Sequence, residues 1–184
     1  MQNKMNKVIF LDRDGTINVE VDYLHEKEKL VFINGVPQAL AQLKRMGYKL
    51  VVVSNQSGIG RGYYSAAEVE RLHEYMNMLL EEQDAAIDAF YYCPHVESDH
   101  CHCRKPQTGM IEQAVKDMNI DLKQSYMIGD KETDVLTAIH AGCQYGLVLS
   151  GHALSKEVQE KYKDHIYMDL QEFVQRIGDT YGMA

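Results

Sequence analysis

Short apolar segments alternate along the chain with longer segments in which apolar residues recur every three or four positions. The short segments are rich in β-branched residues, which is typical of buried strands, and the longer ones have the period of an amphipathic helix. The predicted strands are Lys7–Leu11, Lys49–Val53, Ala89–Tyr92, Ser125–Ile128, Tyr145–Leu149 and a short one near His165–Met168.

Capping signals mark the predicted helices. Ser65 and Glu68 have the spacing of a capping box, and Gly47 and Gly142 stand where two helices should end. Alternating strands and helices predict an α/β fold, with a parallel sheet and helices on both faces. No linker or repeat interrupts the pattern, so a single domain over 1–184 is expected. The predicted helices are Val36–Met46, Ser65–Glu82, Met110–Met118, Thr133–Ala141, one near Lys156–Tyr162 and a last one from Asp169.

Composition narrows the partners that the chain can have. The 184 residues are 45% hydrophobic and 25% charged, as in ordinary globular proteins, and the net charge is −8. No basic run occurs, which argues against nucleic acid as a partner. No apolar leader at the N-terminus and no membrane-spanning stretch can be recognised, so we expect a cytoplasmic protein without a membrane contact.

Polar residues follow the predicted strands at their carboxyl ends. If the strands are parallel, Asp12, Asp14, Ser54 and Asp130 meet at one edge of the sheet, where α/β proteins bind their ligands. A single aspartate there often only caps the next helix. Several unpaired carboxylates repel one another, however, and a hard cation such as Mg²⁺ relieves that repulsion.

The same residues supply the parts of a phosphoryl-transfer site. A carboxylate such as Asp12 can attack phosphorus, and Asp14, two residues on, can protonate the leaving oxygen. Lys105 can supply a fixed positive charge and Ser54 a hydroxyl donor to the phosphate. The chain is therefore predicted to bind a small-molecule phosphate ester.

Four motifs in order resemble those of the haloacid dehalogenase superfamily of phosphatases. Asp12-Arg13-Asp14-Gly15-Thr16 resembles the first motif, Ser54 the second, Lys105 the third and Gly129-Asp130 with Asp134 the fourth. The resemblance implies a Rossmann-like core without a cap domain. It also implies Asp12 as nucleophile and Asp14 as general acid/base. Mg²⁺ would be held by the carboxylates of Asp12 and Asp130 and the backbone carbonyl of Asp14.

Three cysteines and a histidine lie close together in the segment before Lys105. Cys93, His95, Cys101 and Cys103 form a set suited to tetrahedral Zn²⁺. An incidental disulfide or a reduced surface loop are the alternatives. The family resemblance favours His95 over the other two histidines of the loop as the fourth ligand. A closed four-ligand site would be structural and would brace the segment that leads into Lys105.

The zinc loop resembles two branches of the superfamily, one acting on heptose bisphosphates and the other on histidinol phosphate. The loop after the first motif, the residues after Ser54 and the lysine at position 131 favour the heptose branch. Arg104 and Lys131 can bind the second phosphate of a bisphosphate, or they only balance the acidic cluster. The predicted substrate contacts are Arg13, Glu20, Val21, Asp22, Tyr23, Asn55, Gln56, Ser57, Arg104 and Lys131.

Two other classes of function use part of this pattern. A non-catalytic binding module could keep the zinc loop as a partner surface, but all residues that the chemistry requires are present here. A receiver domain also combines acidic residues with a lysine, yet lacks the zinc ligands and the paired acids. We expect a monomeric enzyme, with His25 and His73 on the surface and without a functional role.

Overall fold

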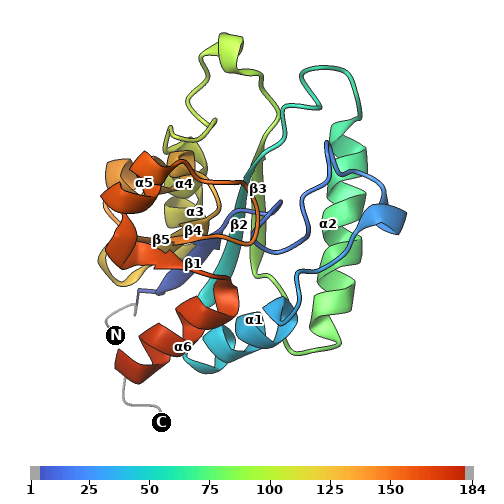
Figure 1. Cartoon of the computed structure of the whole chain (residues 1–184). Coiled ribbons are helices and arrows are strands. Elements are labelled where there is room, and N and C mark those ends of the chain that lie inside the picture. The colour runs from blue at the N-terminus through green and yellow to red at the C-terminus, as the bar shows by residue number, and fades with distance from the viewer. Residues whose placement is uncertain (1–4, 181–184) are drawn as a thin grey trace.

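The computed structural model describes residues 5–180, which contain a six-stranded, entirely parallel sheet. The strand order is β3-β2-β1-β4-β5-β6, so the first strand of the chain lies at the centre (Figure 1). The predicted α/β fold is thus confirmed. The strands are β1 Val8–Leu11, β2 Lys49–Asn55, β3 Ala89–Cys93, β4 Tyr126–Gly129, β5 Gln144–Val148 and β6 Ile166–Tyr167.

Helices cover both faces of the sheet because successive side chains of a strand point to opposite sides. Ile9 and Leu11 of β1 pack in one core cluster with helices α1, α2 and α6, whereas Val8 and Phe10 pack in another with α3 and α4. The helices are α1 Val36–Arg45, α2 Ala66–Glu81, α3 Gly109–Met118, α4 Glu132–Ala141, α5 Lys156–Lys161 and α6 Leu170–Thr180.

Most predicted boundaries agree with the structure within one residue, and strand β2 is the main exception. Its predicted end at Val53 is wrong, because the strand continues through Ser54 and Asn55. These two residues pair in register with Tyr92 and Cys93 of β3. The apolar run stops at Val53, but hydrogen bonding to the neighbouring strand carries polar residues onward. The extension brings Asn55 to the edge of the sheet where ligands bind.

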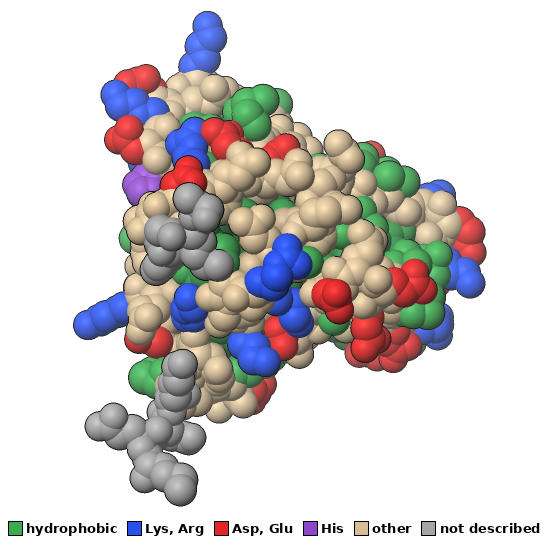
Figure 2. Space-filling model, turned by 90° about the horizontal axis from the view of Figure 1, so that it is seen from below, with side chains coloured by type: hydrophobic (Ala, Val, Ile, Leu, Met, Phe, Trp, Pro, Cys, Tyr) green, Lys and Arg blue, Asp and Glu red, His purple; other side chains and the backbone are tan. Residues whose placement is uncertain are grey.

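The carboxyl ends of the strands and their long loops lie on one side of the molecule. The loop after β3, which contains the short helical turn Glu97–Asp99, extends to the top of Figure 1. Seen from below, acidic and basic side chains are interspersed with hydrophobic ones, and neither sign of charge covers the whole face (Figure 2). Among the described residues, no helix is both long and apolar enough to span a bilayer.

Candidate active site

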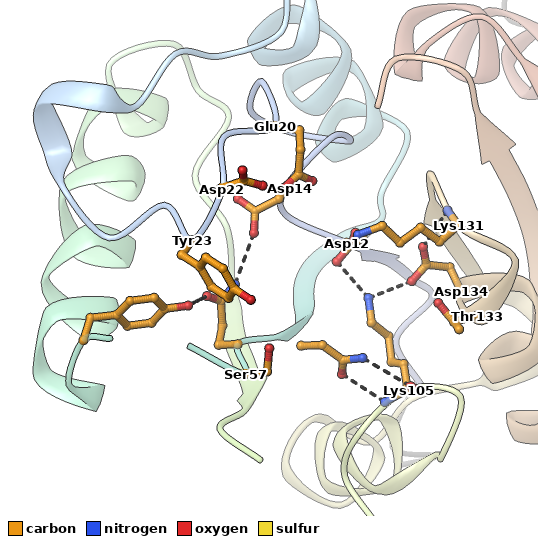
Figure 3. Close-up of a pocket in the computed structure, with 13 residues that line it drawn as sticks. Asp12, Asp14, Glu20, Asp22, Tyr23, Ser57, Lys105, Lys131, Thr133 and Asp134 are labelled. Atoms are coloured by element: carbon orange, nitrogen blue, oxygen red, sulfur yellow. Dashed lines mark hydrogen bonds and ion pairs between the residues drawn. The ribbon is translucent and has the colours of Figure 1, made fainter. Parts of the chain in front are cut away.

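Lys105 joins two carboxylates at the carboxyl edge of the sheet. Its ammonium group donates to Asp12 Oδ1 at 2.8 Å and to Asp134 Oδ1 at 2.7 Å (Figure 3). All three side chains are nearly inaccessible to solvent. Burial alone would raise the pKa of Asp12, but the charge and hydrogen bond of Lys105 hold that pKa below its ordinary value. Asp12 is therefore an anionic carboxylate with one oxygen not bound to the lysine.

Asp130 is fully buried beside this pair, and one of its carboxylate oxygens is unsatisfied. Its Oδ2 accepts from the backbone N–H of His152 at 2.7 Å, while Oδ1 has no hydrogen-bond partner within residues 5–180. Burial, followed by the charge of Asp12, raises the pKa of Asp130 to about 8. Ligand oxygens of Asp12, Asp130 and Asp134 lie within 4.8 Å of one another. An unsatisfied oxygen among crowded carboxylates fits a cation such as Mg²⁺.

Asp134 is less available to a metal than the other two acids. Its Oδ1 accepts from Lys105 and its Oδ2 accepts from the backbone N–H of Lys131 at 3.1 Å. Both oxygens are thus engaged in fixing the lysine and the start of helix α4. One oxygen of Asp12 is not bound to Lys105, and one oxygen of Asp130 has no hydrogen-bond partner among the described residues, so both acids remain available as the magnesium ligands that the sequence predicts.

Gly15 allows the chain to pass directly against Asp130. It has a positive φ of 82°, and a Cβ atom there would collide with the Asp130 carboxylate and with Gly151. Ser150 Oγ donates to the Gly15 carbonyl at 2.9 Å. The loop after β5 therefore closes over the loop after β1 and fixes Asp130 from behind.

Asp14 is held by a different set of partners from Asp12. Arg13 donates from Nε and Nη2 to the Asp14 carboxylate at 3.0–3.2 Å, and Asn18 Nδ2 donates to Oδ1 at 3.0 Å. Gln56 Nε2 donates to Oδ2 at 3.3 Å. The carboxylate still borders the cavity in front of Asp12, so its position is fixed while it stays accessible to a ligand.

A cavity of about 200 Å³ opens in front of Asp12 and Lys105. In the view of Figure 3, Asp14, Glu20 and Asp22 lie on one side of Asp12, and Lys131 and Asp134 lie on the other. Burial, followed by the charge of Asp14, raises the pKa of Glu20. The residues that line this cavity are Asp12, Asp14, Glu20, Asp22, Tyr23, Asn55, Gln56, Ser57, Tyr64, Lys105, Lys131, Thr133 and Asp134.

A wider cavity of about 710 Å³ adjoins the first one and shares Asn55, Ser57, Lys105, Lys131 and Thr133 with it. Arg104 and four residues of the zinc loop, Glu97, His100, Cys101 and His102, contribute to its wall. Three basic side chains thus border the combined space. The structure brings together all but two of the predicted substrate contacts in these two cavities.

The two remaining predicted contacts, Arg13 and Val21, lie elsewhere, and so does Ser54. Arg13 is fully buried behind Asp14, and neither Arg13 nor Val21 is among the side chains that line the cavities. Ser54 is 1% exposed and accepts from Gln56 Nε2 at 2.7 Å, so it stands behind the cavity wall. Gln56 itself does line the smaller cavity, where it links Ser54 to Asp14.

His73, which was expected on the surface, is a further difference between the sequence prediction and the structure. His73 is 4% exposed, and its ring stacks on Phe90 with centroids 4.6 Å apart. The prediction of a surface position was wrong because His73 lies on the apolar stripe of α2 with Val69 and Met76. That helical spacing was a signal that could have revealed its burial.

Two residues of the smaller cavity were given no role in the sequence analysis. Tyr64 donates from its hydroxyl to Gln56 Oε1 at 2.8 Å, and Thr133 lines both cavities. Thr133 lies within the fourth motif, between Asp130 and Asp134, whereas Tyr64 belongs to no motif. Tyr64 comes from the loop after β2, and no pattern in that loop distinguishes an inward tyrosine from the exposed Tyr63 before it.

The four predicted zinc ligands form a compact cluster next to the wider cavity. Their ligand atoms lie 3.0–3.6 Å apart along five of the contacts between them. A tetrahedral Zn²⁺ with thiolate bonds of about 2.3 Å separates its ligands by about 3.8 Å, so a slight expansion would fit the ion. All three thiols are free, and the shortest Sγ–Sγ distance of 3.0 Å is not that of a disulfide.

Asn55 connects the zinc loop to strand β2. Its side chain donates to the Lys105 carbonyl at 3.2 Å and accepts from the Lys105 backbone N–H at 3.0 Å. Lys105 follows Cys103 by two residues, so the loop is fixed at the cysteine cluster and again at Asn55. These two attachments determine where the ammonium group of Lys105 lies.

The parallel sheet, the paired aspartates after β1 and the lysine bridging two acids define a haloacid dehalogenase-type hydrolase. The HAD-hydrolase-like family model matches residues 102–173. The crystal structure of D,D-heptose 1,7-bisphosphate phosphatase from B. bronchiseptica, complexed with magnesium and phosphate, superimposes with a TM-score of 0.83. It is 28% identical and covers 95% of this chain and 99% of its own.

Curated relatives narrow the class further. D-glycero-beta-D-manno-heptose-1,7-bisphosphate 7-phosphatase from Haemophilus influenzae is 48% identical over 83% of this chain and 87% of its own length. The protein of the same name from Escherichia coli K12 is 44% identical over 92% of each chain. The chain therefore belongs to the D-glycero-D-manno-heptose-1,7-bisphosphate 7-phosphatase family.

Proposed function

We propose that the protein hydrolyses the C7 phosphate of D-glycero-β-D-manno-heptose 1,7-bisphosphate. The observation that carries the proposal is the anionic Asp12, held by Lys105 at the mouth of a cavity bordered by basic residues. The relatives named for this activity match over more than four-fifths of the chain, which supports the substrate. Their names specify the β anomer, and we adopt that preference.

Asp12 acts as the nucleophile in the first step. Its free oxygen attacks phosphorus, a P–O bond to Asp12 forms, and the bond between phosphorus and the sugar O7 breaks. Lys105 stays next to Asp12 throughout and compensates negative charge on the transferring group. The product of this step is an aspartyl-phosphate and the free sugar hydroxyl.

Asp14 acts as the general acid and then as the general base. In its protonated form it gives a proton to O7 as the sugar leaves, and afterwards it takes a proton from the water that attacks the aspartyl-phosphate. Hydrolysis releases inorganic phosphate and regenerates the Asp12 carboxylate. Arg13, Asn18 and Gln56 hold Asp14 in place for both proton transfers.

Mg²⁺ would be held by Asp12, by the unsatisfied oxygen of Asp130 and by the backbone carbonyl of Asp14. When bound, it supplies positive charge that stabilises the phosphate oxygens in the transition state. Zn²⁺ would be held by Cys93, His95, Cys101 and Cys103 in a closed structural site. Its role is to keep the loop carrying Arg104 and Lys105 in position.

The second phosphate of the substrate is proposed to lie in the wider cavity. Arg104 and Lys131 border that space and can donate charge-assisted hydrogen bonds to phosphate oxygens. Asn55 and Ser57 line both cavities, and Glu20 and Asp22 face them from the opposite wall, where they can accept from sugar hydroxyls. Tyr23 belongs to the same wall as Glu20 and Asp22. Ser54 does not reach the substrate itself but accepts from Gln56, which lines the cavity and contacts Asp14.

The test is phosphate release with Mg²⁺ from the β anomer, the α anomer and histidinol phosphate, measured side by side. We expect the highest kcat/KM for the β bisphosphate, with release of one phosphate per sugar and the C1 phosphate retained. A higher kcat/KM for histidinol phosphate would overturn the substrate assignment. No release from any of the three, in protein shown to contain Mg²⁺, would overturn the phosphatase function.

A further inference from the structure

His73 makes a polar contact that its apolar surroundings do not explain. It lies on helix α2, and its Nε2 is 3.3 Å from Arg13 Nη1. A guanidinium has only N–H donors, so Nε2 must be the acceptor and the imidazole must be neutral, with its proton on Nδ1. The Phe90 ring stacks on the face of the imidazole and restricts its movement.

The other end of the same guanidinium holds Asp14. Arg13 Nε and Nη2 donate to the Asp14 carboxylate, and Nη2 also donates to the Leu24 carbonyl at 2.9 Å. The guanidinium is a rigid plane, so a displacement of Nη1 also moves the two nitrogens that face Asp14. Within residues 5–180, His73 is the hydrogen-bond acceptor that Nη1 contacts.

We propose that His73 is a positioning residue, which fixes the Asp14 carboxylate through Arg13 in the orientation needed for proton transfer. The proposal rests on the general acid role assigned to Asp14 above. His73 itself lines neither of the two active-site cavities and transfers no proton. It supplies a neutral acceptor that keeps the buried guanidinium in one orientation, and Arg13 transmits that orientation to Asp14.

The protonation state of His73 supports this role. Burial, followed by the charge of Arg13, lowers the pKa of His73 to about 3. The ring therefore remains an acceptor at neutral pH. Gln56 adds a second contact to the same assembly, because its Oε1 accepts from Arg13 Nη2 at 3.4 Å while its Nε2 donates to Asp14.

A misplaced general acid has a chemical signature that a merely destabilised protein lacks. An alkyl phosphate releases a poor leaving group and needs the proton from Asp14, whereas p-nitrophenyl phosphate releases a phenolate of low pKa that needs it much less. Loss of positioning should therefore lower kcat/KM for the heptose bisphosphate and largely spare kcat/KM for the aryl ester, because kcat/KM covers only the steps through release of the leaving group. General loss of folded enzyme lowers both rates equally.

The experiment compares four variants with the unmodified protein on these two substrates. His73→Leu should lower kcat/KM for the sugar ester about 10- to 100-fold and kcat/KM for the aryl ester by about threefold or less. His73→Gln, whose amide oxygen can accept from Arg13, should recover most of the lost rate. Leu80→Ala, a packing control at a buried apolar position of the same helix, should lower the melting temperature without changing the ratio of the two kcat/KM values. Asp14→Asn is the reference for loss of the acid.

Equal losses on both substrates in His73→Leu, while Asp14→Asn shows the selective loss, would overturn the positioning role and leave the role of Asp14 intact. Failure of His73→Gln to recover the ratio in a folded protein would also overturn it. Equal losses of kcat/KM on both substrates in Asp14→Asn would overturn the proposed acid role, and the positioning role with it, because kcat/KM excludes the later hydrolysis of the aspartyl-phosphate that both substrates share.

Discussion

The acidic cluster around Lys105 and the cysteine cluster around His95 are both suited to a metal, yet they are built differently. In the acidic cluster the chain's own ammonium group lies between Asp12 and Asp134, and one oxygen of Asp130 is left without a partner. In the cysteine cluster the four ligand atoms face one another. The first cluster borders a cavity and can admit a substrate, whereas the second is closed.

This difference separates two uses of a metal. Lys105 already compensates part of the charge on the carboxylates, so the fold does not depend on Mg²⁺ to hold that region together. The cysteine loop has little regular structure of its own and takes its shape from its ligands. Loss of metal should therefore cost activity at one cluster and stability at the other.

The largest expected effect comes from removing the nucleophile of the acidic cluster. Asp12→Asn should lower kcat about 10⁴-fold or more, because an amide cannot form the acyl phosphate. The fold should persist, since Lys105 keeps its contact with Asp134. Steady-state kinetics measures the loss of kcat, and thermal unfolding measures whether the fold persists. Asp164→Asn, at an exposed position, is the matched control. Substantial activity in Asp12→Asn would show that Asp12 is not the nucleophile.

The cysteine cluster should show the opposite pattern. Cys93→Ser, or chelation of Zn²⁺, should lower the free energy of unfolding by several kcal/mol, on the order of 3, because a structural metal stabilises the folded state. At temperatures below the new melting temperature, the folded variant should still hydrolyse the substrate. Cys143→Ser is the control, since that thiol lies outside the cluster. A melting temperature unaffected by chelation, in protein shown to lose zinc, would contradict the structural role.

Asp130→Asn should weaken magnesium binding without affecting zinc. The concentration of Mg²⁺ that gives half-maximal activity should rise about 100-fold, because a charged ligand becomes neutral. Calorimetric titration measures the dissociation constant of Mg²⁺ without turnover, and this constant should rise as well. The zinc content should equal that of the unmodified protein. An unchanged magnesium affinity in both measurements would exclude Asp130 as a ligand.

The smallest effect is expected where the two regions meet. Arg104 donates to the His95 carbonyl at 3.4 Å and also borders the wider cavity. Arg104→Ala should raise KM for the bisphosphate about 10-fold and leave kcat and zinc content nearly unchanged. A monophosphate substrate should show no such rise. Arg71→Ala, an exposed arginine on α2, serves as the control. Equal KM increases for both substrates would argue against binding of the second phosphate.

Much of this arrangement could be predicted because it follows from local rules. Apolar periodicity located every strand and helix, and parallel strands bring their carboxyl ends to one edge, so Asp12, Asp130 and Lys105 could be expected together. The spacing of the cysteines likewise indicated their cluster. These features depend on strand order and short-range spacing, which one sequence contains.

The rest depends on side-chain directions that periodicity does not encode. Arg13 and Asp14 are adjacent in the first motif, yet one turns into the core and the other toward the cavity. Ser54 lies behind Gln56 because β2 continues past its apolar run. His73 could have been placed from its helical stripe, but its contact with Arg13 joins segments 60 residues apart and required the tertiary structure.

The closure of the loop after β5 over Gly15 has a consequence for synthesis of the protein. Asp12 emerges from the ribosome early, but Asp130 is fixed only when His152 arrives, and Gly151 must then pack against Gly15. Until β4 has been synthesised, the central strand β1 can pair only with β2. A nascent chain that ends before this loop can form the β1–β2–β3 half of the sheet but not the magnesium site. Catalytic competence can thus be acquired only late in translation, after the loop that contains Gly151 and His152 has been synthesised.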